Sequence, residues 1–221
     1  MKIKIALLGL LSALTLTAWS QSTVTTNATV GALIPDGNPS GLASSLTLSG
    51  SGGPISSVTV SLNISGGYNG DLYAYLAGPV GQFAVLLNRV GESSGNALGY
   101  ANAGFNITLS DTGSDIHTSG SYLLGSGAVS GSYLADGRNI NPLAAGSAFD
   151  PAGTAGLSSF IGTDANGIWS LFVADMSGGG QSTLVSWGLT VVTVPEPQSW
   201  AMLAGGFMSL FLLRRNKFGR K

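Results

Sequence analysis

The chain of 221 residues contains no cysteine, one histidine and few charged side chains, which make up only 9% of it. The absence of cysteine excludes a disulfide framework, a thiol nucleophile and a thiolate metal site. A formal net charge of −1 leaves no basic excess for binding phosphate backbones, so we expect no nucleic-acid partner. The length fits one domain with peripheral segments.

The charges are distributed unevenly along the chain. Only two of the nine basic residues, Arg89 and Arg138, lie between positions 22 and 194, whereas nine acidic residues lie there. The chain is therefore an acidic, glycine-rich body between two apolar segments with basic flanks.

The first twenty residues have the three features of a secretory signal peptide. Two lysines precede an apolar run at 5–16, and Ala18 and Ser20 place small residues at −3 and −1 of a cleavage site. The run is shorter than the roughly 20 residues that span a membrane. We predict that signal peptidase removes residues 1–20 and that the protein is exported; an uncleaved anchor is the alternative.

The last 28 residues, 194–221, combine a short motif, an apolar stretch and a basic tail. The motif is Pro195-Glu196-Pro197, the stretch covers 200–213, and Arg214 and Arg215 follow it. Fourteen helical residues rise about 21 Å, less than a hydrocarbon core of roughly 30 Å, and the arginines favour a cytoplasmic tail. We therefore expect an apolar helix that acts as a marginal stop-transfer anchor, held by charge as much as by hydrophobicity.

These three features, in this order, resemble the PEP-CTERM sorting signal of Gram-negative bacteria. The resemblance implies recognition by an exosortase, a membrane transpeptidase-like enzyme, with cleavage near the Pro-Glu-Pro motif. It also implies a host that makes exopolysaccharide, with the protein inserted transiently in the inner membrane and then placed at the cell surface or in the extracellular matrix. A permanent single-pass anchor is the alternative.

The body, residues 22–193, shows short alternation of apolar and polar residues between clusters of Gly, Ser, Asn and Pro, and no long helical periodicity. This pattern predicts an all-β fold, a jelly-roll-like β-sandwich. Strands are expected at 58–64, 105–109, 169–173 and 185–191, and the continuous apolar run 83–87 predicts a central strand covered on both faces.

The region from Thr112 to Ser159 is rich in small residues and has few large apolar side chains. Here we expect long loops with one or two irregular strands, at Ser121–Leu124 and Val129–Leu134.

Two blocks of the body resemble the P domain of proprotein convertases (P/Homo B). Tyr68–Gly81 has the family's G-D-L…L…P-x-G stretch, and Gly167–Asp175 has its G-x-W-x-L-x-V-x-D stretch. The resemblance extends over residues 55–192. It implies a jelly-roll β-sandwich that packs against a subtilisin-like protease, so docking to a separate protease is one alternative function.

The sequence offers little for catalysis. His117 is the only histidine, no Gly-x-Ser-x-Gly motif accompanies it, and its polar neighbours predict a solvated loop. A zinc site needs several converging ligands, and one histidine without cysteine argues against such a site. We therefore expect a protein that is not an enzyme.

Calcium is the one cofactor for which the sequence offers ligands, because Ca²⁺ binds Asp and Asn oxygens in flexible loops. The candidate ligands are Asp71 and Asp175, which match acids of the P-domain motifs, and Asp164 and Asn166. The alternative is that these residues cap turns.

These features together predict an exported, non-enzymatic protein with a structural or adhesive role in exopolysaccharide or biofilm. A carbohydrate-binding module is the second hypothesis, with Tyr68, Tyr73 and Tyr75 as possible glycan contacts. Tyr73 and Tyr75 would point to the same face of a strand, because side chains alternate.

Overall fold

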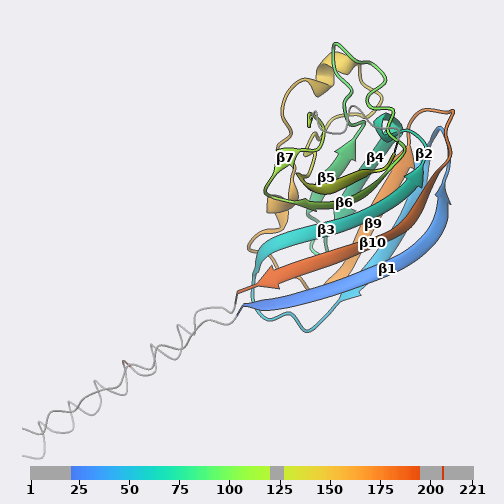
Figure 1. Cartoon of the computed structure of the whole chain (residues 1–221). Coiled ribbons are helices and arrows are strands. Elements are labelled where there is room, and N and C mark those ends of the chain that lie inside the picture. Colours follow the sequence, from blue (N-terminus) through green and yellow to red (C-terminus); the bar gives the residue numbers. More distant parts are fainter. Residues whose placement is uncertain (1–20, 120–126, 195–205, 207–221) are drawn as a thin grey trace, which may run out of the picture.

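A computed structural model describes residues 21–119, 127–194 and 206 of the chain. Within these residues a pair of sheets forms a β-sandwich (Figure 1). The larger sheet has six strands in the order β1 (Ser22–Ile34), β10 (Ser182–Thr193), β3 (Ile55–Gly66), β6 (Gly104–Ser110), β8 (Val129–Leu134) and β7 (Ser114–Asp115). The smaller sheet has four, in the order β2 (Asn38–Leu48), β9 (Gly167–Asp175), β4 (Leu72–Ala77) and β5 (Phe83–Asn88). The all-β sandwich expected from the sequence is confirmed.

The strand pairing is antiparallel except around β8, which runs parallel to both β6 and β7. The first and last strands of the sandwich are neighbours, with Ser22 of β1 opposite Thr193 of β10. Within the described part of the chain, the loops contain three short 3-10 helices: η1 (Asn69–Asp71), η3 (Gly146–Phe149) and η4 (Leu157–Phe160).

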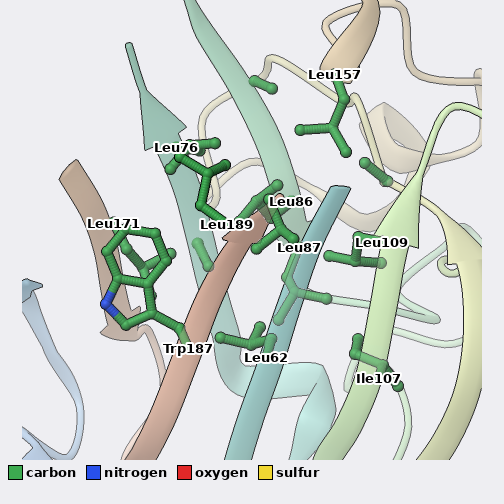
Figure 2. Packing of buried hydrophobic residues seen from close by; sticks show 14 of the residues in the cluster. Leu62, Leu76, Leu86, Leu87, Ile107, Leu109, Leu157, Leu171, Trp187 and Leu189 are labelled. Atoms are coloured by element: carbon green, nitrogen blue, oxygen red, sulfur yellow. The ribbon is translucent and has the colours of Figure 1, made fainter. Parts of the chain in front are cut away.

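The core lies between the two sheets and is filled by the inward residues of alternating strands. Figure 2 shows Leu62 and Trp187 of the larger sheet with Leu76 and Leu171 of the smaller sheet in this layer. Burying each large apolar side chain contributes about 1.5–3 kcal/mol. The indole N–H of Trp187 donates to Ser44 Oγ at 2.9 Å, so this buried ring leaves no unpaired donor.

Strands β3, β6, β9 and β10 contain the four segments expected from alternation, and β8 matches the expected strand at Val129–Leu134. The expected strand at Ser121–Leu124 lies outside the described residues. The prediction for 83–87 is only half right: β5 is buried, but it is the last strand of its sheet. Segment 135–160 covers β5; for example, the N–H of Val85 donates to the Ala155 carbonyl at 2.9 Å.

The signal peptide (1–20) and, apart from Val194 and Gly206, the expected sorting segment (194–221) lie outside the described residues. Among the helices that the structure describes, none is long and apolar enough to cross a membrane.

Candidate functional site

Asp71 and Asp175, the first two candidate ligands, lie side by side at one end of the smaller sheet. β4 begins where β9 ends, with Leu72 opposite Asp175, and the N–H of Met176 donates to the Asp71 carbonyl at 2.7 Å. Both side chains are buried: Asp175 is fully covered and Asp71 is 7% exposed. Pairing of the two strands thus brings together two carboxylates about a hundred residues apart in the sequence.

Burial and mutual repulsion disfavour the ionised forms of these carboxyls. Loss of hydration, followed by the charge of Asp175, raises the pKa of Asp71 to about 6, although Arg89 opposes the shift. Loss of hydration also raises the pKa of Asp175, against the hydrogen bond from the Ser177 N–H. Two carboxyls here therefore bind a proton more readily than they would in water.

One nearby cation is shared among several acids. Arg89 Nε lies 3.0 Å from Glu92 Oε2 and donates to the Gly70 carbonyl at 2.9 Å, while Arg89 Nη2 lies 3.6 Å from Asp71 Oδ1. Burial raises the pKa of Glu92 as well. The end of the sheet therefore has an excess of buried negative charge.

Among the described residues, two buried carboxylate oxygens of these acids accept no hydrogen bond, and only Glu92 Oε2 has the charge of Arg89 Nε beside it, at 3.0 Å. Asp175 Oδ1 accepts the Ser177 N–H at 3.1 Å, but the buried Asp175 Oδ2 has no hydrogen-bond partner among the described residues. Asp36 adds a third charge that raises the pKa of both Asp71 and Asp175, yet its carboxylate accepts the Gly179 N–H at 3.1 Å. Within the described residues of the chain, no three acidic or histidine side chains converge as metal ligands.

Asp164 and Asn166, the other candidate ligands, lie at the opposite end of β9. A strand from Gly167 to Asp175 is about 26 Å long, so one ion cannot reach both pairs. The amide of Asn166 bonds both backbone groups of Ser51, at 3.1 and 3.0 Å, and donates to Asp164 Oδ1 at 2.8 Å. These contacts brace two loops, as the turn-capping alternative expects.

His117 does not lie in a solvated loop, and that prediction is wrong. The ring is 2% exposed, lies 5.9 Å from the Phe149 ring in a stacked arrangement, and contacts two acceptors. Nδ1 lies 2.8 Å from Asp136 Oδ2, and Nε2 lies 2.8 Å from the carbonyl of Glu92. Both ring nitrogens therefore face oxygen atoms, which hold the buried ring between Asp136 and the Glu92 carbonyl.

Asp136 anchors the loops around His117. Its Oδ2 also accepts the N–H of Asn88 at 3.0 Å, and its Oδ1 lies 3.2 Å from Arg138 Nη1. Arg138 reaches on to Asp115 Oδ2 at 3.1 Å. Because a carboxylate and a carbonyl occupy both ring nitrogens of His117, the histidine and its aspartate hold loops together rather than activate a nucleophile.

A second candidate site is an aromatic band on the outer face of the smaller sheet. We define it as Tyr73, Tyr75, Phe83 and Phe172. Tyr75 is directly opposite Phe172, and their rings stack with centroids 5.0 Å apart. Tyr73 lies 5.9 Å from Tyr75, and Phe83 lies 6.5 Å from it. The band lies on three adjacent strands, β9, β4 and β5.

Local sequence fixes the outward direction of this band. Leu72, Ala74 and Leu76 face the core, so the tyrosines between them must point outward. Gly41 of β2 lies beside Phe172: a Cβ at Gly41 would be 2.7 Å from the ring, so only glycine admits the ring here. The third tyrosine candidate, Tyr68, is not in ring contact with the band in the described structure and lies against Gly180.

The candidates named from the sequence did not include Phe83 and Phe172 of the band, nor Arg89 and Glu92, which lie beside Asp71 and Asp175. The alternation of β9 marks Phe172 as outward, between the inward Leu171 and Val173. Its position opposite Tyr75 depends on strand pairing, which no local pattern reveals.

Comparison with known proteins gives a distant likeness in fold. No family model and no curated protein matches the chain, so the two resemblances above rest on the quoted residues alone. Among solved structures, the chain is similar to the serine protease of Aeromonas sobria, alone (18% identity, TM-score 0.43) and in complex with the chaperone ORF2 (17%, 0.45). Each match covers 79% of this chain and 27% of the solved chain, so this chain spans about a quarter of that protease's length. Similarity at this level carries no argument about activity.

Proposed function

We propose that the protein is an exported, non-enzymatic protein of the cell surface or extracellular matrix that adheres to exopolysaccharide through the aromatic band. The signal peptide and the sorting segment expected at the two ends would deliver it, with exosortase processing near Pro195–Pro197. We also propose that the strands of the sandwich are connected as in a jelly roll, as the sequence predicts.

The observation that carries the proposal is the mutual contact of four aromatic side chains on an outer sheet face. Aromatic rings that face solvent expose apolar surface, so binding of a partner that covers this surface is favourable in free energy. The C–H faces of sugar rings can pack on such rings, and the tyrosine hydroxyls can bond sugar hydroxyls.

The surroundings of the band favour a neutral, hydroxyl-rich ligand. The four strands of the smaller sheet contain no charged residue except Asp175, which is buried. Beside the band, Ser45 Oγ and Ser170 Oγ lie 2.8 Å apart on neighbouring strands. Polysaccharide fits this mixture of rings and hydroxyls better than an anionic polymer bound through salt bridges.

The proposal contains no catalytic step. Both nitrogens of His117 face acceptors, and Asp71 and Asp175 are buried at the end of the sheet.

Retention of the protein on immobilised host exopolysaccharide tests the proposal. We expect Tyr75→Ala and Phe172→Ala to weaken binding by about three- to tenfold each, because one aromatic contact contributes about 0.5–1.5 kcal/mol. Tyr68→Ala is the matched control, since Tyr68 is 46% exposed but lies outside the band. Circular dichroism verifies that each variant is folded. Equal loss in all three variants, or binding that none of them changes, would contradict the assignment.

A further inference from the structure

Most edges of the two sheets are protected against pairing with another strand. β7 has only two residues, and segment 135–160 covers β5 through bonds such as that from the Gly137 N–H to the Val85 carbonyl (3.0 Å). β2 contains Pro39, and its pairing with β9 is irregular between Asn38 and Leu42. Short strands, coverage, proline and irregular pairing are the usual means of blocking an open edge.

β1 lacks most of these protections. It is 13 residues long, lies at the rim of the larger sheet (Figure 1), and pairs with β10 alone among the described strands. No proline and no charged residue occurs from Gln21 to Ile34. Its register with β10 is regular from Ser22 to Thr29 and shifts only after that, before Ala32. Along Ser22–Thr29, the N–H and C=O groups of every second residue therefore point away from β10 and have no partner among the described strands.

We propose that this edge pairs, antiparallel, with β1 of a second copy of the chain across a two-fold axis. The strand is suited to its own copy because, without charge, it meets no repulsion from itself. With the axis at Thr25, each outward threonine faces a polar residue: Thr25 opposite Thr25, and Thr23 opposite Asn27. This register keeps outward side chains opposite outward ones, as a pleated pair requires.

The inward side of β1 supports the same arrangement. Val24 and Ala28 pack against the core but remain half-buried at the rim of the sandwich. In the pairing above, Val24 lies opposite Thr26 of the second copy, which covers it further. The dimer joins two six-stranded sheets into one continuous sheet, through isologous contacts that close after two copies.

The absence of cysteine makes a direct test available. We would place one cysteine at Thr25 in the full chain, purified in mild detergent, and follow disulfide-linked dimers after mild oxidation. Ser61→Cys is the matched control, because Ser61 is exposed and lies in β3, the next strand beyond β10, away from the edge. We expect the Thr25→Cys chain to cross-link at least tenfold faster, and dithiothreitol to release the monomers.

A second variant separates edge pairing from chance collision. Thr23→Lys together with Asn27→Lys, added to Thr25→Cys, places like charges directly opposite each other on both sides of the two-fold axis and should reduce cross-linking at least fivefold without unfolding the chain. Equal cross-linking at Thr25 and Ser61, a monomer at every concentration, or no effect of the two lysines would each overturn the proposal.

Discussion

The raised pKa of Asp71 predicts an unusual dependence of stability on pH. A carboxyl with a pKa of about 6 in the folded chain and about 4 in the unfolded chain binds its proton more tightly when folded. Between these values folding takes up a proton. The stabilising contribution of protonated Asp71 is therefore complete below about pH 4, is lost as the pH rises to about 6, and stays absent above it.

The size of this effect follows from the shift. A rise from 3.8 to about 6 is roughly two pKa units, and each unit corresponds to about 1.4 kcal/mol. Ionised Asp71 thus costs the fold about 2–3 kcal/mol at neutral pH. Asparagine has the same shape and cannot ionise, so Asp71→Asn should stabilise the protein by about that amount at pH 7.5 and change it little at pH 4.

Urea unfolding followed by fluorescence of the buried Trp169 and Trp187 would measure this difference at several pH values. Asp150→Asn is a control of opposite sign, because hydrogen bonds from Ser94 lower the pKa of the exposed Asp150. Asp175→Asn should move the window to lower pH, since the charge of Asp175 helps to raise the pKa of Asp71. If Asp71→Asn lost stability equally at pH 4 and pH 7.5, the reasoning from burial and repulsion would be refuted.

Three further predictions follow from the other features. Millimolar Ca²⁺ at pH 7.5 should raise the thermal midpoint of the wild type and of Asp164→Asn but not that of Asp71→Asn or Asp175→Asn. The reason is that the unsatisfied Asp175 Oδ2 lies beside Asp71, and an unchanged midpoint of the wild type would count against a cation there. His117→Gln should destabilise the fold by about 3 kcal/mol, because the buried Asp136 Oδ2 and Glu92 carbonyl both lose a hydrogen-bond partner. Urea unfolding measures this loss, and an unchanged stability would disprove the role of the ring in holding the loops together. Intact masses from fractions of the host should begin near Gln21 and end near Pro195–Pro197, whereas a complete tail in the inner membrane would remove the sorting proposal.

Much of the sandwich was predictable because its inner strands alternate strongly. β3, β6, β9 and β10 place large apolar side chains at every second position, and that pattern survives without any knowledge of partners. β1 and β2 were not predicted, because they contain mostly threonine, serine and alanine where other strands have large apolar residues. β5 was placed wrongly within its sheet because a loop covers it as thoroughly as another strand would.

The candidate sites were less predictable, because each depends on contacts between distant segments. Asp71 and Asp175 could be named from the two P-domain-like blocks, but their adjacency comes from the pairing of β4 with β9. The burial of His117 depends on Asp136 and the Glu92 carbonyl, which approach from separate loops. The polar residues around His117 in the sequence therefore predicted a solvated ring, whereas the ring is buried.

The neighbouring positions of β1 and β10 set the order in which this sandwich can assemble. Thr25 and Thr190 touch through their hydroxyls at 3.0 Å, although 165 residues separate them. A chain that emerges from its N-terminus produces β1 first and its partner last, and such non-local pairing folds slowly. Until Thr193 has emerged, β1 has two open edges instead of one. Folding of the body is therefore completed only after Thr193 has emerged.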